Sequence, residues 1–214
     1  MYKYSLIHPA PFVTRPRAFV VFSIKTEKRG KMSELLDRAR SVLVIIDVQE
    51  KLFPAVCERE RVLGKLELLI AAAGVFGIPV MLTEQYPSGL GPTLGEIRGL
   101  LPEVRPLEKI DFSCVSSPGF CERLSGFGRN QIVLAGIETH ICVVQTALEL
   151  DSRGERVFVA ADASSSRRPI DHEFGLRRMD RAGITLMTAE SVVYEWLRRA
   201  GTEEFKRLRA RLKD

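Results

Sequence analysis

The chain has 214 residues, of which 45% are hydrophobic, and a formal net charge of +5. This length suits one α/β domain, or one domain with an appendage, and the composition allows a full-sized core. Residues 1–31 hold seven Lys and Arg and one acid, so the remaining 183 residues carry 25 basic and 26 acidic side chains. A nearly neutral body argues against a nucleic-acid partner, which would need a basic face.

Location and redox state are also bounded by the sequence. No apolar run approaches the roughly 20 residues that span a bilayer, so we expect no membrane partner. The N-terminus lacks an apolar core followed by a small-residue cleavage site. The four cysteines show no C-x-x-C motif and no zinc-type spacing with the three histidines. We therefore expect reduced thiols in a cytoplasmic protein.

Residues 1–31 form a basic, acid-poor segment ahead of a second methionine, Met32. Three interpretations stay open: a start codon assigned too far upstream, an ordered arm used in subunit contacts, and an organelle-targeting segment. Targeting has the weakest support, because three prolines would disrupt a long amphipathic helix. We treat 1–31 as a basic arm or a wrongly assigned start, and 32–214 as the domain.

Predicted strands and helices alternate from Ser41 onward. The strand segments are SVLVIIDVQ (41–49), IPVMLTEQ (78–85), QIVLAG (131–136), RVFVAAD (156–162) and GITLMTA (183–189). Helical segments cover 58–77, begin near Thr139 and Ile170, and fill the C-terminal end with a break at Gly201. The alternation predicts right-handed crossovers and a three-layer α/β/α fold, with a mostly parallel, Rossmann-like sheet of five or six strands.

Polar residues follow the carboxyl ends of three predicted strands: Asp47, Glu84 and the turn 136–142. Sites in open α/β sheets gather outside these ends. A carboxylate at such an edge is partly desolvated, which raises its pKa and suits it to proton transfer. An Asp that only caps the next turn is an equally good interpretation of Asp47.

Cys142 falls on the first turn of a predicted helix. Unpaired N–H groups and the helix dipole there favour a thiolate, so we expect a reactive cysteine. The alternative is a small buried hydrophobe, as most free cysteines are. His140 is poorly placed as its base, because positions two apart on a helix do not face each other. His172 is expected at the surface.

Lys109 lies in RPLEKIDFSC, a stretch that resembles a loop. Its neighbours Glu108 and Asp111 would make a solvated ion pair there. Alternatively, its ammonium lies beside a thiolate and lowers the pKa of that cysteine. The spacing in the sequence does not choose between the two.

These elements together resemble the isochorismatase-like cysteine hydrolase superfamily, which includes nicotinamidases. The likeness runs from about residue 41 to 193 and rests on IIDVQ, on EKIDFS and on GIETHICV followed by QTA. The segments LTEQYPSGLG, GIETHIC and ADASSSR further resemble a branch of isochorismatase-domain proteins whose physiological substrates are poorly defined.

The resemblance implies a catalytic triad of Asp47, Lys109 and Cys142. It also implies a cis peptide at Ile137–Glu138 and an oxyanion hole made by the backbone N–H groups of Glu138 and Cys142. The expected activity is hydrolysis of a C–N, amide-like bond in a small molecule through a thioester on the cysteine. A homo-oligomer, either a dimer or a tetramer, is implied as well.

Residues near these motifs are candidates for binding the substrate. We name Gln49, Phe53, Tyr86 and Phe112, although each of the aromatic residues would serve equally well as ordinary core.

Two departures from the family pattern narrow the function. Nicotinamidases carry a metal-binding Asp-x-His after the second strand, whereas this chain reads TEQYPSG there, so we expect no metal and no other cofactor. Enzymes that cleave the vinyl ether of isochorismate often lack the cysteine that this chain keeps. Vinyl-ether hydrolysis with Asp47 as the acid, and a scaffold without turnover, remain the alternatives.

Overall fold

The computed structural model of the protein describes residues 34–212. The basic segment 1–31 lies outside these residues. The three interpretations of that segment, and the division of the chain at residue 32, therefore remain predictions.

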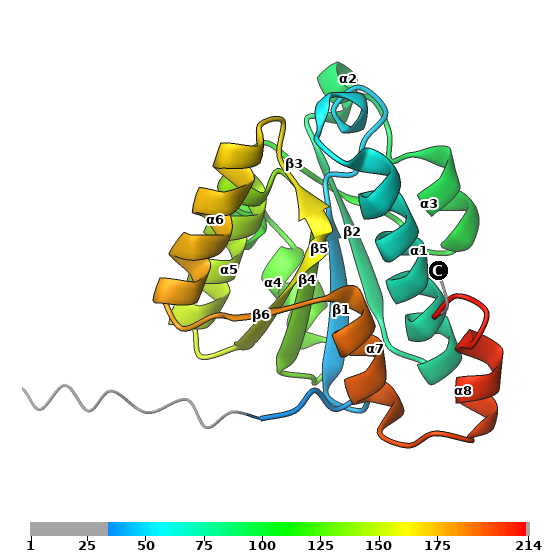
Figure 1. Ribbon diagram of the computed structural model, residues 1–214. Coiled ribbons are helices and arrows are strands. Elements are labelled where there is room, and N and C mark those ends of the chain that lie inside the picture. The colour runs from blue at the N-terminus through cyan, green and yellow to red at the C-terminus, as the bar shows by residue number, and fades with distance from the viewer. Residues whose placement is uncertain (1–33, 213–214) are drawn as a thin grey trace, which may run out of the picture. The chain divides into compact units, whose positions relative to one another are not determined.

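Six parallel strands form one sheet in the described part of the chain, in the order β3-β2-β1-β4-β5-β6. The strands are β1 (Ser41–Ile46), β2 (Val80–Gln85), β3 (Leu107–Lys109), β4 (Gln131–Ile137), β5 (Arg156–Ser165) and β6 (Thr185–Met187). Helices lie on both sides of this sheet (Figure 1). The predicted three-layer α/β fold with a Rossmann-like sheet is confirmed.

Two groups of helices cover the two faces of the sheet. The α-helices are α1 (Arg59–Phe76), α2 (Pro87–Leu90), α3 (Gly95–Leu100), α4 (Phe120–Ser125), α5 (Val144–Ser152), α6 (Pro169–Arg181), α7 (Ala189–Leu197) and α8 (Glu203–Leu208). Shorter helical turns are η1 (Phe53–Ala55), η2 (Cys114–Ser116) and the π-helical η3 (Thr139–Val143). In Figure 1, α1, α3, α7 and α8 lie on one side, and α4, α5 and α6 on the other.

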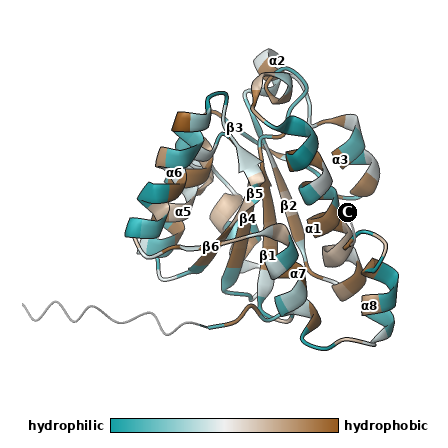
Figure 2. Cartoon of the chain, viewed as in Figure 1, coloured by the Kyte–Doolittle hydropathy of each residue, from teal (hydrophilic) through white to brown (hydrophobic). Residues whose placement is uncertain are grey.

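The side chains of β1 alternate between two hydrophobic cores. Leu43 and Ile45 belong to the core that includes α1 and α7, whereas Val44 and Ile46 belong to the core that includes α5 and α6. A strand covered on both faces needs apolar side chains at every position, which explains its continuous apolar run. Figure 2 shows the strands in brown inside the fold and teal on the outer faces of the helices.

The first strand is shorter than the sequence suggests and ends at Ile46. Asp47 has a φ of 54°, in the left-handed region, which Asp tolerates better than most residues. The chain therefore leaves the sheet at Asp47, and the carboxylate stays at the carboxyl edge of β1.

The strand β3 is absent from the sequence prediction, which gave a loop. It has only three residues, with Leu107 and Lys109 buried and Glu108 exposed between them. So short an edge strand leaves no periodic signal. Its pairing with β2 sets Lys109 opposite Gln85, at the carboxyl edge of the sheet.

The strand order reverses between β1 and β4, because β2 lies on one side of β1 and β4 on the other. Ligand sites in such sheets lie outside the strand ends at this switch point. Asp47 follows β1 directly, and η3 with Cys142 follows β4.

Gly136 in β4 lies where a side chain does not fit. Its φ is 117°, and a Cβ there would lie 2.2 Å from the carbonyl oxygen of Ile46. We expect Gly136→Ala to lower the free energy of unfolding by about 1–3 kcal/mol from backbone strain alone, with the clash adding to this. Gly64→Ala, at an exposed and open position within α1, should instead raise it by about 0.5–1 kcal/mol. Urea unfolding checks both, and an unchanged Gly136→Ala would contradict the close packing of β1 and β4.

Candidate active site

Three side chains from distant parts of the sequence meet at the carboxyl edge of the sheet. The Lys109 Nζ lies 2.6 Å from Asp47 Oδ2 and 3.6 Å from Cys142 Sγ. The side chains of Lys109 and Asp47 are fully buried, and Cys142 is 5% exposed. The solvated ion pair that the sequence left open for Lys109 is therefore wrong.

Asp47 is held by the neighbouring strand β2. The hydroxyl of Thr83 donates a 2.7 Å hydrogen bond to Asp47 Oδ1, and the Asp47 N–H donates to the Thr83 carbonyl at 3.2 Å. One carboxylate oxygen thus accepts from a hydroxyl, and the other faces the Lys109 ammonium. The carboxylate is fixed between a neutral and a charged partner.

The Lys109 ammonium is surrounded by acceptors. Besides Asp47 and Cys142, it donates to Gln85 Oε1 at 2.5 Å and lies 3.3 Å from the carbonyl oxygens of Asp111 and Phe112. Burial is the largest single effect and lowers the pKa of Lys109, but the Asp47 carboxylate, together with Cys142 and Cys114, more than offsets it and raises the pKa above its ordinary value of 10.5. The lysine is a fixed positive charge at neutral pH.

Cys142 differs from the expected easily ionised thiol. Burial, followed by the charge of Asp47, raises the pKa of Cys142 well above its ordinary value, and Lys109 offsets only part of this. The prediction from the helix dipole was wrong because the sulfur is buried beside the Asp47 carboxylate. A raised thiol pKa favours the protonated sulfur in the resting site.

Cys114 is a second thiol near this site, and reasoning from the sequence assigned it no role. Its sulfur lies 3.9 Å from the Thr83 hydroxyl, and its N–H donates to Thr146 Oγ1 at 3.0 Å. Burial, then the charge of Asp47, raises the pKa of the Cys114 thiol to about 11. Cys114 is fully buried and packs in the same core cluster as Cys142.

The turn before Cys142 is fixed through Glu138. The Ile137–Glu138 peptide bond, for which the family resemblance implies a cis bond, is cis in the structure. The Glu138 carbonyl accepts the N–H groups of Ile141 at 3.0 Å and Val143 at 3.2 Å. The buried Glu138 carboxylate accepts from the N–H of Arg167 at 2.9 Å and from its Nε at 3.1 Å.

The predicted substrate-binding residues fall into two groups. Gln49 is fully buried, and its amide bonds the backbone of Gln85, while Phe53 packs in the core that includes α1. Both side chains serve the scaffold. Tyr86, directly after β2, is 53% exposed, and Phe112, three residues after β3, is 55% exposed.

The histidines of the described chain lie around η3. His140 Nδ1 is 3.0 Å from Ser166 Oγ, and its Nε2 is 4.0 Å from Asp171 Oδ2. His172, expected at the surface, is half-buried, and its Nδ1 lies 2.9 Å from Thr139 Oγ1. Burial lowers the pKa of His172. Within residues 34–212, no group of three His, Cys, Asp or Glu side chains is placed to hold a metal ion.

Comparison with known proteins places this geometry in a family. The model of the isochorismatase domain matches residues 41–191, which contain all three buried side chains. The chain belongs to the isochorismatase family. Isochorismatase domain-containing protein 2A of Mus musculus is 35% identical over 187 residues, covering 87% of this chain and 88% of that protein.

Solved structures agree with the family assignment. The MAR1 ribonuclease of Caenorhabditis elegans superimposes with a TM-score of 0.79 at 31% identity, covering 85% of this chain and 93% of that one. The Escherichia coli YcaC gene product, an octameric hydrolase of unknown specificity, superimposes with a TM-score of 0.77 at 25% identity, covering 84% of this chain and 93% of that one. The fold is therefore that of an isochorismatase-family hydrolase.

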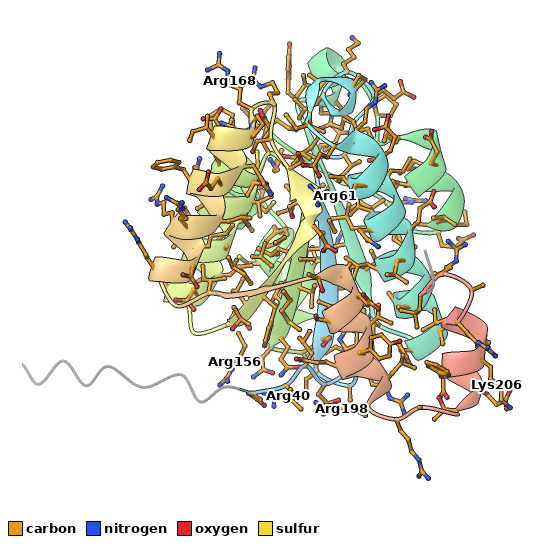
Figure 3. All side chains as sticks on the ribbon, in the orientation of Figure 1. Arg40, Arg61, Arg156, Arg168, Arg198 and Lys206 are labelled. Atoms are coloured by element: carbon orange, nitrogen blue, oxygen red, sulfur yellow. The ribbon has the colours of Figure 1, made fainter. Side chains whose placement is uncertain are left out.

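Arginine side chains lie at both ends of the sheet in this isochorismatase-family chain. In Figure 3, Arg168 lies near the start of α6, Arg61 lies on α1, and Arg156 lies toward the opposite end of the sheet. Arg61 pairs with Glu58, and Arg156 pairs with Glu34. Among the described helices, none has the length and hydropathy needed to cross a membrane.

Proposed function

We propose that the protein is a cysteine hydrolase that cleaves a C–N bond of a small amide through a thioester on Cys142. The observation that carries the proposal is the ammonium of Lys109, which lies within 2.6 Å of Asp47 Oδ2 and 3.6 Å of Cys142 Sγ in a buried site. A nucleophile and a base that both contact one fixed positive charge are the parts that covalent catalysis requires.

The first step is proton transfer from the Cys142 thiol to the Asp47 carboxylate. This step moves a negative charge from oxygen to sulfur, while Lys109 contacts both atoms. The net charge of the buried site stays at zero, so the transfer requires no new charge in a region of low dielectric. A raised thiol pKa in the resting site fits a proton that leaves only during the reaction.

The sulfur then attacks the amide carbonyl carbon and forms a tetrahedral oxyanion. We assign the oxyanion hole to the backbone N–H groups of Glu138 and Cys142, on the turn that Arg167 fixes through the Glu138 carboxylate. Loss of one such donor typically costs about 2.7–4 kcal/mol of barrier.

Collapse of the oxyanion breaks the C–N bond, and protonated Asp47 gives its proton to the leaving amine. Water then attacks the thioester while Asp47 takes a proton from it. Collapse of this second tetrahedral intermediate breaks the C–S bond, releases the acid product and expels the thiolate, which takes the proton back from Asp47. Asp47 therefore acts as base and then acid in each half of the reaction.

The substrate is small and uncharged at the reacting end. Cys142 is only 5% exposed, so a bulky group does not fit beside the sulfur. The charges of Asp47 and Lys109 already balance, and an anionic substrate would meet no free cation among them. Tyr86 and Phe112, both exposed near the strand ends, are proposed to contact the outer part of the substrate.

A substrate panel tests the proposal. Purified full-length protein is incubated with small aliphatic and aromatic amides, ureas, isochorismate and single-stranded RNA, and products and protein mass are followed. We expect amine release with an acyl adduct on the Cys142 peptide. RNA is included because the nematode relative is described as a ribonuclease; RNA cleavage without amide cleavage would overturn the proposal.

We also propose that the protein works as a homo-oligomer in the cytoplasm. An octameric relative supports the assembly, and 25% identity over 84% of the chain makes it a useful guide. Light scattering during size-exclusion chromatography should give a mass that is a multiple of 24.0 kDa. A mass of one chain at micromolar concentration would contradict the assembly.

A further inference from the structure

The Lys109 ammonium has a neutral partner that the reaction does not use. Gln85 Oε1 accepts from Lys109 Nζ at 2.5 Å, which is as close as the Asp47 carboxylate at 2.6 Å. Gln85 is 9% exposed, and it stands opposite Lys109 in the pairing of β2 with β3. Thr83, two residues earlier, points to the same face and bonds Asp47.

The orientation of the Gln85 amide is fixed at its nitrogen end. Gln85 Nε2 donates to the Ile110 carbonyl at 2.6 Å, so the oxygen of the same amide must face the ammonium. The ammonium needs an acceptor, and a reversed amide would present N–H groups to it.

The backbone of Gln85 is fixed as well. Its N–H donates to Gln49 Oε1 at 2.8 Å, and its carbonyl accepts from Gln49 Nε2 at 3.0 Å. Gln49 Nε2 also donates to the Gly91 carbonyl at 2.7 Å. A chain of contacts therefore runs from Gln49, two residues after Asp47, through Gln85 to Lys109.

We propose that Gln85 is a positioning residue, a neutral clamp that holds the Lys109 ammonium between Asp47 and Cys142 without adding charge. This inference rests on the proposed function, in which the ammonium must follow the negative charge from carboxylate to sulfur. Only a neutral acceptor leaves Asp47 and the thiolate as the two anions that share Lys109.

A charged residue at this position should therefore impair the cysteine. With Gln85→Glu, a second carboxylate competes with Asp47 and Cys142 for the Lys109 ammonium. The site also gains a negative charge, which disfavours a thiolate. With Gln85→Met, which has a similar length, the ammonium loses an acceptor and no charge is added. The two variants separate the effect of charge from the effect of positioning.

The test is the rate at which iodoacetamide alkylates Cys142, followed by peptide-resolved mass spectrometry from pH 6 to 10. We expect Gln85→Glu to slow alkylation by about tenfold for each unit by which the thiol pKa rises, and to move the pH profile upward. Gln85→Met should slow it less, without a comparable shift. Asn130→Asp makes the same amide-to-carboxylate change at an exposed residue just before β4, at the opposite end of the sheet from the site, and should match the wild type.

The Lys109→Met background separates positioning from a general structural effect. If Gln85 acts through the ammonium, Gln85→Glu should add little to the loss that Lys109→Met already causes. Equal losses in both backgrounds, or Gln85 variants that match the wild type while Lys109→Met is slow, would overturn the inference. A Lys109→Met protein that alkylates like the wild type would instead overturn the proposed function, because the ammonium would then have no role at the sulfur.

Discussion

Cys142→Ala is expected to abolish amide hydrolysis, with a loss of about 10⁴–10⁶-fold in kcat. The loss is this large because no other described side chain can form the covalent intermediate in its place. Cys114, the other thiol in the same core cluster, is fully buried, and burial raises its pKa to about 11. Steady-state kinetics on the best amide of the panel measure the effect.

Two comparisons make the Cys142→Ala result specific. Cys121→Ala removes a half-buried thiol outside the site and should keep the wild-type rate. Cys142→Ser keeps the geometry with a weaker nucleophile and should leave only a trace of turnover. An amidase rate in Cys142→Ala within tenfold of the wild type would rule out the thioester.

The same variant distinguishes the alternative chemistry. Cleavage of the isochorismate vinyl ether needs an acid but no nucleophilic sulfur, so Asp47 alone would carry it. Activity on isochorismate that survives in Cys142→Ala would favour that reaction over amide hydrolysis. An absence of turnover on every substrate, with no adduct on Cys142, would favour a scaffold role.

The fold could be predicted from the sequence wherever a strand or helix has a long hydrophobic pattern. Strands such as β1 and β4 are buried on both faces, so their apolar runs are continuous and easily recognised. The strand β3 was not predicted, because three residues at the sheet edge are too few to show a periodic hydrophobic pattern. The end of β1 was placed too late, because the left-handed turn at Asp47 is a local conformation rather than a change in hydropathy.

The sequence could predict which strands and turns hold the residues of the site. The rule that sites lie outside strand ends found Asp47 and the turn before Cys142, and the family resemblance added Lys109. The sequence could also have indicated Thr83 and Gln85 as site residues. They are polar, they stand two positions apart at the end of a buried strand, and they therefore share one face of the sheet. The predicted direction of the shift in the Cys142 pKa was wrong. The shift depends on burial and on Asp47, which lies 95 positions away in the sequence.

Asp47→Asn is expected to reduce amide hydrolysis by about 10²–10⁴-fold, because the base that takes the thiol proton is lost. The exposed Asp111→Asn is the matched control, since Asp111 contacts Lys109 only through its carbonyl. It should keep the wild-type rate. A similar loss in both variants would point to altered packing of the lysine rather than to loss of a base.

The stability of Asp47→Asn provides an independent check on the ion pair. Removal of one partner leaves the buried Lys109 uncompensated, which typically costs about 3–5 kcal/mol of unfolding free energy near neutral pH. In the wild type the pKa of Lys109 is raised, so its contribution is present below pH 10.5 and is lost as the pH rises through the folded pKa.

In the Asn variant the sign of this pH dependence reverses. Burial remains and the Asp47 charge is gone, so the pKa of Lys109 falls below 10.5, and the folded state binds fewer protons than the unfolded state. The free energy of unfolding should therefore rise from pH 7 toward pH 10 in Asp47→Asn, relative to the wild type. Urea unfolding at several pH values measures this, and parallel curves for the two proteins would show that Asp47 does not hold the lysine charge.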